Sequence, residues 1–196
     1  MATHSRYNVS HEVNQEILKN ILGIRDQKML DDAETLLLSD AYETFFKRLQ
    51  AGRLKFNVKL IFEINKYFLD TLYAWAGKIR TVEISKGGVL FCASSQIKKE
   101  LKKLEKVIKD NLPKPKDDRK RLSKKFAVIH CEFNAIHPFR EGNGRTIRLF
   151  LDLLAANNGY KTINYSQSSH KDYIQACIAG MSQDYSKMQK VIQKGL

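Results

Sequence analysis

The sequence has few cysteines and no long apolar segment. Its three cysteines, Cys92, Cys131 and Cys177, are widely spaced and form no Cys-x-x-Cys motif. This pattern favours reduced thiols over a disulfide framework, and Cys92 is the one whose exposure matters most. No apolar run approaches the 18 residues of a membrane span, and we find no signal peptide, internal repeat or low-complexity stretch. We therefore expect a soluble cytoplasmic protein with no membrane contact. Export as an effector stays open, because specialised secretion machines need no amino-terminal signal.

Common nucleotide and metal motifs are also absent. The sequence has no Gly-x4-Gly-Lys-Ser/Thr loop, no His-Glu-x-x-His and no Cys/His cluster at zinc spacing. His130 and His137 lie seven residues apart with Cys131 between them, a spacing that leaves a transition-metal site open. His130 shares a predicted helical face with Phe126 and Phe133, which favours a packed or hydrogen-bonded histidine instead.

The length of 196 residues suits one buried core and is short for two domains, so we expect a single domain over residues 1–196. Asp117 or Asp118 is a natural N-cap, and Gly159 follows a predicted helix where a C-terminal glycine is typical. Helical spacing or strong helix formers predict helices over residues 11–22, 25–49, 58–75, 96–111, 118–133, 143–157, 170–179 and 183–193. The predicted fold is an all-α helical bundle.

One β-hairpin interrupts the predicted helices at about residues 81–92. Residues 81–85 and 89–92 are short β-prone runs, and Lys86-Gly87-Gly88 between them is typical of a glycine turn. A two-stranded ribbon leaves unpaired edge groups that an added extended peptide can satisfy. The alternative is a plain structural hairpin packed on the helical body.

Residues 137–148 combine a base, a carboxylate, two glycines and two arginines in the segment HPFREGNGRTIR. The apolar spacing after Arg145 predicts a helix that begins near Asn143. Gly142 and Gly144 let the backbone approach a ligand closely, and first-turn N–H groups of a helix bind anions. Arg145 and Arg148 are neighbours on one helix face and could both bind phosphate oxygens. Because two arginines at a helix N-terminus oppose its dipole, a strong anion is implied.

Two further residues of this loop indicate chemistry. Glu141 adds negative charge beside the expected phosphates, and Mg²⁺ resolves that conflict because it binds one or two carboxylates together with substrate phosphates. His137 is placed at the mouth of the loop as a general base, held by the rigid Pro138 and by Phe139, which we expect in the core.

Residues 137–148 resemble the complete signature of the Fic family, His-Pro-Phe-x-Asp/Glu-Gly-Asn-Gly-Arg-x-x-Arg. The stretch LYAWAGKIR at residues 72–80, followed by ISKGG at 84–88 and Leu90-Phe91, is similar to the segment that leads into the hairpin called the flap in Fic proteins. The resemblance covers about residues 20–190 and implies a Fic-type helical bundle.

The resemblance implies transfer of AMP from ATP to a Tyr, Thr or Ser hydroxyl of a target protein, with release of pyrophosphate. His137 would deprotonate the hydroxyl, and Glu141 would hold Mg²⁺ between the α- and β-phosphates. The backbone of Gly142, Asn143 and Gly144 would form the anion hole. Asn143 and Arg145 would contact the α/β-phosphates, and Arg148 the γ-phosphate, while Pro138 and Phe139 would be structural. A target segment would pair edge-on with the flap residues Ser85, Lys86, Gly87, Gly88, Val89 and Leu90.

Control is where the sequence departs from many Fic proteins. These resemble one another in an inhibitory helix with Ser/Thr-x-x-x-Glu-Gly/Asn, whose glutamate pairs with the last motif arginine. Here Ser39 and Glu43 have that spacing, but Thr44 follows and the segment belongs to a predicted core helix. We therefore expect a separate antitoxin that supplies the glutamate in trans, and a toxin role in a bacterial toxin–antitoxin pair. Resemblance to stand-alone Fic toxins makes type II topoisomerases candidate targets.

The net charge of +13 is concentrated outside the motif. Residues 98–125 contain 13 basic and 5 acidic residues, an excess of 8. A run of this kind could contact nucleic acid or an acidic partner, although a solvated face is the commoner reading and is favoured here.

Three functional classes stay open in order of preference. The first is an adenylyltransferase that uses ATP. The second is a transferase with another donor, moving UMP, GMP or phosphate, because nothing in the motif recognises the base. The third is a binding protein with a dormant site, which the intact base and carboxylate disfavour.

Overall fold

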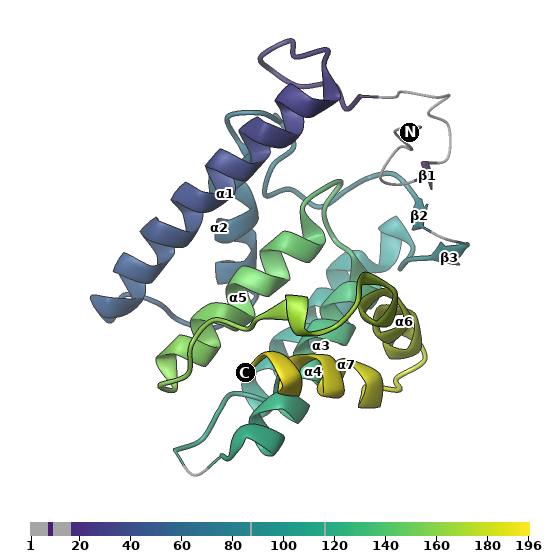
Figure 1. Ribbon diagram of the computed structural model, residues 1–196. Coiled ribbons are helices and arrows are strands. Elements are labelled where there is room, and N and C mark those ends of the chain that lie inside the picture. Colours follow the sequence, from purple (N-terminus) through teal and green to yellow (C-terminus); the bar gives the residue numbers. More distant parts are fainter. Residues whose placement is uncertain (1–7, 10–16, 87, 116) are drawn as a thin grey trace.

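Helices form most of this computed structural model, which describes residues 8–9, 17–86, 88–115 and 117–196. Within these ranges the helices are α1 (Gln27–Gln50), α2 (Val58–Leu69), α3 (Ile97–Asp110), α4 (Arg119–Ile136), α5 (Asn143–Asn157), α6 (His170–Met181) and α7 (Ser186–Gly195). The strands are β1 (Asn8–Val9), β2 (Ile84–Lys86) and β3 (Val89–Leu90). Helix α5 runs between α1 and α2 on one side and α4, α6 and α7 on the other (Figure 1). The predicted all-α bundle with one small hairpin is confirmed.

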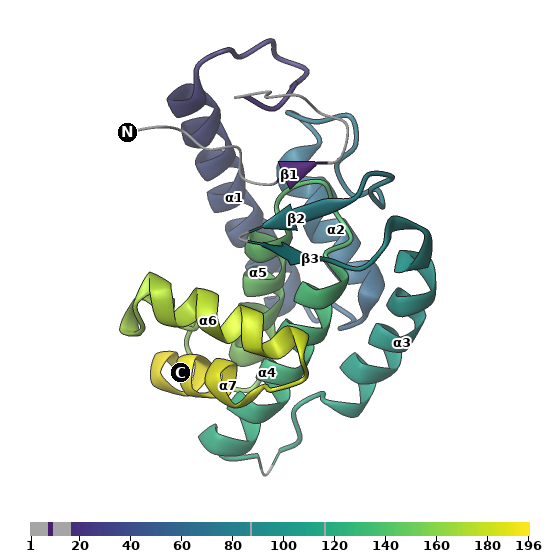
Figure 2. The same ribbon diagram turned by 90° about the vertical axis from the view of Figure 1, so that its right-hand side faces the viewer.

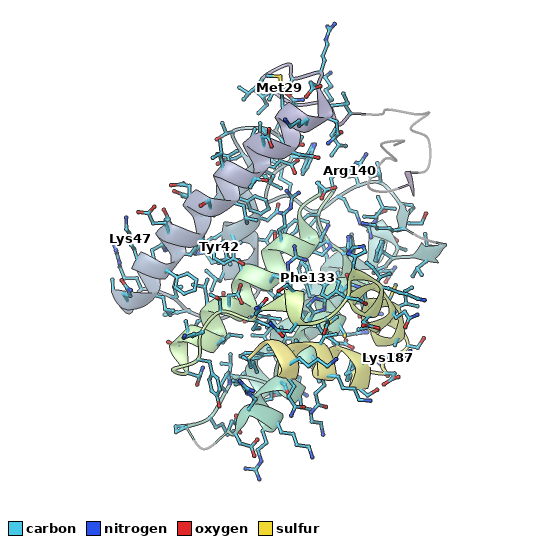
Figure 3. The ribbon with its side chains drawn as sticks, in the orientation of Figure 1. Met29, Tyr42, Lys47, Phe133, Arg140 and Lys187 are labelled. Atoms are coloured by element: carbon cyan, nitrogen blue, oxygen red, sulfur yellow. The ribbon has the colours of Figure 1, made fainter. Side chains whose placement is uncertain are left out.

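The core surrounds α5, where large apolar side chains from α2, α4 and α5 meet. Phe68, Phe126 and Phe150 are completely buried there. Phe133 of α4 lies inside the molecule, whereas Met29, Lys47 and Lys187 project from its periphery (Figure 3). Turned by 90°, the molecule shows α6 and α7 side by side, with the hairpin next to the beginning of α5 (Figure 2). Packing on both sides therefore fixes α5, which carries the second half of the 137–148 segment.

Short polar side chains start several helices as the sequence predicts. Asp118 accepts a hydrogen bond from the Arg121 N–H at the start of α4, and Asn57 and Ser169 cap α2 and α6 in the same way. Gly159 has φ +80° just after α5. Helix α5 differs at its start, because its N-cap is Gly142 and no side chain caps it.

Two predicted helices differ from the structure. Helix α2 ends at Leu69 and not at residue 75. Tyr73 and Trp75 stack at 4.4 Å in the turns that follow, and Gly77 adopts φ +65° while donating its N–H to Asn65. Tertiary packing of the aromatic residues thus outweighs the local helical spacing.

The second difference concerns the predicted helix over residues 11–22. Residues 11–16 lie outside the described residues, and residues 17–22 are a loop. Asn20 uses its side-chain amide to bond the backbone carbonyls of Leu18 and Ile24 and the N–H of Ile24. Such local side-chain bonds compete with helical bonds, which explains the loop.

The hairpin is shorter than predicted and has a third strand. Strands β2 and β3 pair antiparallel with Ser85 opposite Leu90, and β1 pairs with the other edge of β2. The sheet order is therefore β1-β2-β3. Strand pairing stops after Leu90, because the Cys92 N–H turns to the carbonyl of Ala135 at the end of α4. In the described sheet β2 is therefore the central strand, and the outer edge of β3 has no strand neighbour.

Candidate active site

The end of α4 places His137 in an unusual backbone conformation. His137 has φ 48° and ψ 61°, in the left-handed region, and its N–H still bonds the carbonyl of Phe133 at 2.9 Å. Pro138 disfavours helical backbone in the residue before it, so α4 must end here. A non-glycine residue in this region stores about 1–2 kcal/mol of strain, which the surrounding packing has to offset. The imidazole is thereby turned towards the hairpin.

The imidazole of His137 is a neutral base in this setting. It is 4% exposed and stacks on the Phe91 ring at 3.8 Å. Burial, with smaller contributions from the charges of Arg80 and Lys86, lowers the pKa of His137 to about 3. Nδ1 lies 3.2 Å from the Asn134 carbonyl oxygen. Because a carbonyl oxygen only accepts, Nδ1 carries the hydrogen and Nε2 is the proton-accepting nitrogen.

A buried arginine joins this helix end to the hairpin. Arg80 is 4% exposed, and its Nε donates to the His137 carbonyl at 2.8 Å. Its other nitrogens donate to the carbonyls of Val82 and Cys92, on either side of the hairpin. The backbone N–H of Arg80 donates to the Pro138 carbonyl at 2.8 Å. Arg80 therefore fixes the hairpin against the start of the 137–148 segment. Sequence reasoning assigned no role to Arg80 beyond its place in the stretch at residues 72–80. The neighbouring residues do not show that its guanidinium bonds carbonyls distant in sequence.

The loop between Pro138 and α5 is held by amide side chains. Asn143 accepts from the Phe139 N–H at 2.9 Å and donates to the Phe139 carbonyl at 2.7 Å. Asn65 of α2 donates to the Glu141 carbonyl and to the Thr146 hydroxyl oxygen, both at 3.1 Å. Phe139 is completely buried, as predicted. The Asn143 amide, expected at the phosphates, is thus bonded to its own loop.

The two glycines of the loop meet different constraints. Gly142 has φ +81°, and a Cβ there would come within 3.0 Å of Leu69, Phe68 and Asn65. This glycine is needed for packing on α2. A Cβ at Gly144 would meet only the Arg148 guanidinium at 3.3 Å. Gly144 lines a pocket, and its role in letting a ligand approach stays a prediction.

Arg145 is engaged by two carboxylates. Its NH1 lies 2.5 Å from Glu34 of α1, and its NH2 lies 3.3 Å from Glu141. Glu34 is 1% exposed and also accepts a hydrogen bond from the Tyr73 hydroxyl. Glu141 is 4% exposed and accepts the Gly142 N–H at 2.7 Å. Sequence reasoning missed Glu34, because it lies 111 residues from Arg145 in the chain.

Arg148 lies next to two tyrosines, one just before α6 and one on it. Its guanidinium carbon lies 5.9 Å from the ring centres of Tyr165 and Tyr173, and its NH1 is 3.5 Å from the Tyr173 hydroxyl. The two arginines, expected to act together, therefore lie in separate environments. Ser39 and Glu43 take no part here, since Glu43 is on α1 and pairs with the exposed Lys47.

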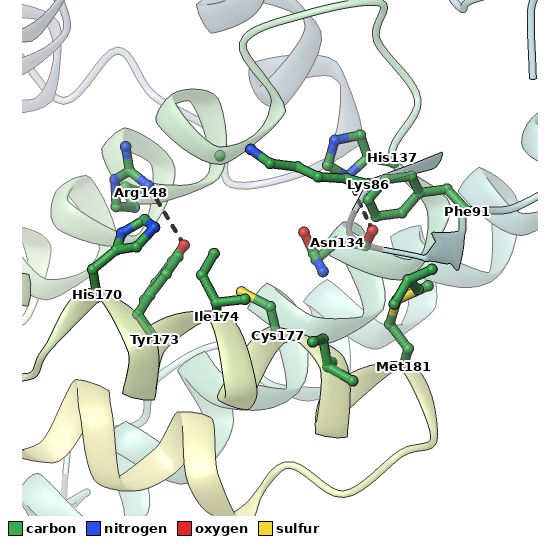
Figure 4. Close-up of a pocket in the computed structure, with 13 residues that line it drawn as sticks. Lys86, Phe91, Asn134, His137, Arg148, His170, Tyr173, Ile174, Cys177 and Met181 are labelled. Carbon is green, nitrogen blue, oxygen red and sulfur yellow. Dashed lines mark hydrogen bonds between the residues drawn. The ribbon is translucent and has the colours of Figure 1, made fainter. Parts of the chain in front are cut away.

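A pocket of about 480 Å³ opens between the hairpin, α4, the start of α5 and α6. Figure 4 shows His137 and Phe91 on one side and Arg148 with His170 on the other. Helix α6 supplies most of the apolar wall, where burial raises the pKa of Cys177 to about 11 and keeps the thiol neutral. The lining residues are Lys86, Val89, Phe91, Asn134, His137, Gly144, Arg148, His170, Tyr173, Ile174, Cys177, Ile178 and Met181.

Sequence reasoning missed the α6 residues of this pocket. Tyr173, Ile174, Cys177, Ile178 and Met181 form an apolar stripe at helical spacing, which was the available signal. Such a stripe normally packs on the core, yet the buried residues of α6 are Ala176 and Gly180. The larger side chains instead face the pocket.

The hairpin residues named from the sequence divide into two groups. Lys86 and Val89 line the pocket, and Gly88 turns with φ +78°. Leu90 is 67% exposed on β3, and Ser85 is paired within the sheet. Gly87 lies outside the described residues.

The histidine and the cysteines considered as metal ligands or thiols have the following surroundings. His130 is hydrogen-bonded to Tyr173, as the packed alternative predicts. Among residues 17–86, 88–115 and 117–196, no three His, Cys, Asp or Glu side chains group as a metal site. Cys131 is buried, and Cys92 and Cys177 are half-buried free thiols. The described helices include none long and apolar enough to span a membrane.

The chain matches a known protein family and is similar to curated proteins over most of its length. Residues 55–155 match the model of the Fic/DOC family. Over 180 residues the chain is 31% identical to "Probable protein adenylyltransferase y4lH" of Sinorhizobium fredii, with 91% of this chain and 90% of that protein covered. It is 29% identical to protein adenylyltransferase VbhT of Bartonella schoenbuchensis, of which it covers 37%, and 92% of this chain is covered.

Solved structures have the same fold. The N-terminal Fic domain of the Bep8 effector from Bartonella sp. 1-1C superposes with a TM-score of 0.79 at 24% identity, covering 93% of this chain and 92% of that one. A Fic domain from Bartonella quintana, solved with bound ADP, superposes with a TM-score of 0.74 at 28% identity, covering 91% and 89%.

Proposed function

Because the chain belongs to the Fic/DOC family, we propose that it is a protein adenylyltransferase, which moves AMP from ATP to a hydroxyl group of a target protein and releases pyrophosphate. One observation carries the proposal. The neutral His137 lies in the lining of a pocket of about 480 Å³ that also contains Arg148 and Gly144. A proton acceptor, a positive charge and an apolar wall in one pocket are what a nucleotide and an acceptor hydroxyl require.

His137 acts as the general base in this proposal. Its Nε2 takes the proton of a Tyr, Thr or Ser hydroxyl, the oxygen attacks the α-phosphorus of ATP, and the bond to the β-phosphate oxygen breaks to release pyrophosphate. The low pKa of His137 supports this role, since the imidazole is unprotonated at neutral pH. A positioned base contributes about 10²- to 10⁴-fold in rate.

The start of α5 and its arginines bind the phosphates. The backbone N–H groups of Asn143 and Gly144 form the anion hole, which is supported by the absence of a side-chain cap on α5. The Gly142 N–H, a further predicted member, donates to Glu141 in this structure and joins them by exchanging that carboxylate for a phosphate oxygen. Arg148 contacts the outer phosphate from the pocket wall. Arg145 remains a predicted ligand of the α/β-phosphates, and direct contact requires its guanidinium to exchange a carboxylate for a phosphate oxygen.

Glu141 is the residue that would hold Mg²⁺. Its donor chemistry fits the ion, because Mg²⁺ prefers carboxylate oxygen and takes its remaining ligands from phosphates and water. One carboxylate beside an anion-binding turn is sufficient for an ion that arrives with a nucleotide. When bound, Mg²⁺ neutralises charge on the phosphates.

The apolar part of the pocket suits the nucleoside. Ile174, Ile178 and Met181 of α6 line the pocket together with Phe91 and Val89. Flat aromatic bases pack well on such side chains. The polyphosphate then extends towards Arg148 and the start of α5, where the positive groups lie.

The hairpin is the proposed docking element for the target. A target strand can add to the edge of β3, where Leu90 is exposed, whereas the β2 edge already pairs with β1. This arrangement holds the acceptor hydroxyl next to His137, because Phe91 directly follows β3 and stacks on the imidazole.

We further propose that the protein is a cytoplasmic bacterial toxin controlled by a separate antitoxin. The proposal is supported by Glu43, the glutamate at inhibitor spacing from Ser39, which lies on α1 and pairs with Lys47. In this proposal the inhibitory glutamate comes in trans. Type II topoisomerases are the candidate targets. The protein expressed alone should then arrest growth, whereas the His137→Ala variant should not. Healthy growth with active enzyme and no partner gene nearby argues against the toxin role.

Labelled ATP tests the proposed reaction. The protein is incubated with Mg²⁺, a cell lysate and ATP labelled at either the α- or the γ-phosphate. Label should remain on a target protein only from the α position, and His137→Ala should abolish it. Retention of γ-label contradicts AMP transfer, and competition by excess GTP or UTP over ATP favours another donor. Identification of the labelled protein names the target.

A further inference from the structure

Arg148 lacks the carboxylate partner that Arg145 has. Among the described residues, no Asp or Glu oxygen lies within 4.0 Å of its guanidinium. Two tyrosines enclose it, each with its ring centre 5.9 Å from the guanidinium carbon. Its polar contact within this part of the chain is the Tyr173 hydroxyl, 3.5 Å from NH1. The charge of Arg148 therefore remains available to an anion, while aromatic contacts fix its side chain.

The Tyr173 hydroxyl is itself oriented by a second residue. It lies 2.8 Å from Nε2 of His130, on α4. Arginine only donates hydrogen bonds, so the tyrosine oxygen must accept from Arg148. Its own proton then goes to His130. Burial, with a smaller effect from the charge of Arg148, lowers the pKa of His130 to about 3, so the neutral ring has a nitrogen that can accept it. The bonds therefore run in one direction, from Arg148 through Tyr173 to His130.

His130 is poorly explained as a structural residue. It is 1% exposed, and its Nδ1 has no hydrogen-bond partner in the described structure. Burying an unsatisfied donor is unfavourable, and an apolar side chain of similar size would fill the site without that penalty. The imidazole of His130 differs from an apolar side chain of similar size in its hydrogen bond to Tyr173. Groups of this kind recur near functional sites.

We propose that Tyr173, supported by His130, is a positioning residue that holds Arg148 towards the outermost phosphate and thereby sets the preference for a nucleoside triphosphate over a diphosphate. This inference rests on the proposed function. It assigns a role to one pocket residue, Tyr173, and to one residue behind the pocket wall, His130.

Tyr165 provides a matched control. Its ring lies at the same 5.9 Å from Arg148, but its buried hydroxyl has no hydrogen-bond partner in the described structure. Tyr173→Phe and Tyr165→Phe therefore remove the same group from two rings that flank one guanidinium. Only the first change removes a bond to Arg148.

The test measures binding of ATP and of ADP to the full-length variants by titration calorimetry, with melting temperatures recorded alongside. We expect Tyr173→Phe to weaken ATP binding by roughly three- to tenfold and to leave ADP binding unchanged, since one hydrogen bond to a charged group is lost. Tyr165→Phe should alter neither. Equal weakening of ATP and ADP, or an unchanged ratio of the two, overturns the inference.

His130 is tested by rescue. His130→Leu removes the acceptor for the Tyr173 hydroxyl, whereas His130→Gln supplies a side-chain oxygen in its place. We expect a reduced ATP-to-ADP preference in His130→Leu and partial recovery in His130→Gln. Identical preferences in both variants and the wild type contradict the role of His130. If the wild type binds no ATP, the proposed function fails. If it transfers AMP normally while Tyr173→Phe keeps its preference, only this inference fails.

Discussion

Arg145 and Arg148 lie three residues apart on α5, yet one faces carboxylates and the other faces tyrosines. On the α1 side of the loop, Glu34 and Glu141 both contact the Arg145 guanidinium, and Glu34 is almost completely buried. On the pocket side, Arg148 contacts aromatic rings and a hydroxyl. The same residue type at neighbouring positions thus has its charge compensated in one place and available in the other.

Residues that stabilise the loop and residues available to a ligand therefore lie on different sides of it. Buried pairs such as Arg145–Glu34 tie α1 to the start of α5, because breaking them leaves a charge without compensation in the interior. The pocket side contains instead a strained, neutral histidine and an arginine without a carboxylate partner in the described residues. Such groups add little stability and are suited to chemistry. Mutations on the two sides should therefore affect different measurements.

The largest effect is expected on the pocket side from His137→Ala. The variant loses the proton acceptor, so AMP transfer should fall by about 10²- to 10⁴-fold. Its melting temperature should fall only moderately, because the change removes the stacking of the imidazole on Phe91 but breaks no buried ion pair. Initial rates with α-labelled ATP and a thermal unfolding curve check both statements. A variant that unfolds readily, or one that keeps its rate, would contradict the assignment of His137 to chemistry and not to stability.

The largest stability effect is expected on the α1 side from Arg145→Met. Loss of this guanidinium leaves Glu34 buried next to Glu141, which should lower the free energy of unfolding by about 3–5 kcal/mol. Replacing both members of the pair, as in Glu34→Leu with Arg145→Leu, should recover much of the loss. Denaturant unfolding measures these differences. A loss for Arg145→Met below about 1 kcal/mol means that the pair does not hold the loop.

Acid should destabilise the protein through its buried histidines. Burial lowers the pKa values of His130 and His137 to about 3, below the ordinary value of 6.5, so the unfolded chain binds more protons between these pH values. Stability from these groups is present above pH 6.5 and is lost as the pH falls towards 3. The slope should approach about 1.4 kcal/mol per pH unit for each histidine. His130→Leu should remove half of this slope, and an unchanged slope would contradict the assignment.

The smallest effect is expected at an exposed ion pair. Lys103 and Glu100 of α3 lie 2.8 Å apart, but their side chains are 62% and 30% exposed. Surface pairs of this kind contribute about 0.2–1 kcal/mol, so Lys103→Ala should change the free energy of unfolding by less than about 1 kcal/mol. Comparison with Arg145→Met in the same denaturant series sharpens the contrast between buried and exposed pairs. Similar losses for the two variants would mean that burial is not the deciding factor.

Elements with strong local signals were predictable from the sequence. The helix over residues 143–157 begins and ends as expected, since its apolar spacing and its flanking glycines are local features. Asp118 caps α4, and Phe139 lies in the core. The loop at 137–148 could be located for the same reason, because all its residues are adjacent in sequence.

Features that depend on distant residues could not be predicted. Helix α2 ends early because Tyr73 stacks on Trp75 and bonds Glu34, contacts that no local pattern encodes. The pairing of Arg145 with Glu34 joins residues 111 positions apart. The pocket wall on α6 was missed because an apolar stripe looks the same whether it faces a core or a ligand.

The most direct test of this division is the ATP affinity of Arg148→Met, measured by titration calorimetry together with its melting temperature. We predict that ATP binding weakens by roughly tenfold or more while the melting temperature stays within about 2 °C of the wild type, because Arg148 binds the ligand and forms no ion pair with a carboxylate of the described residues. Unchanged affinity, or a loss of affinity that comes with a large fall in melting temperature, would contradict it.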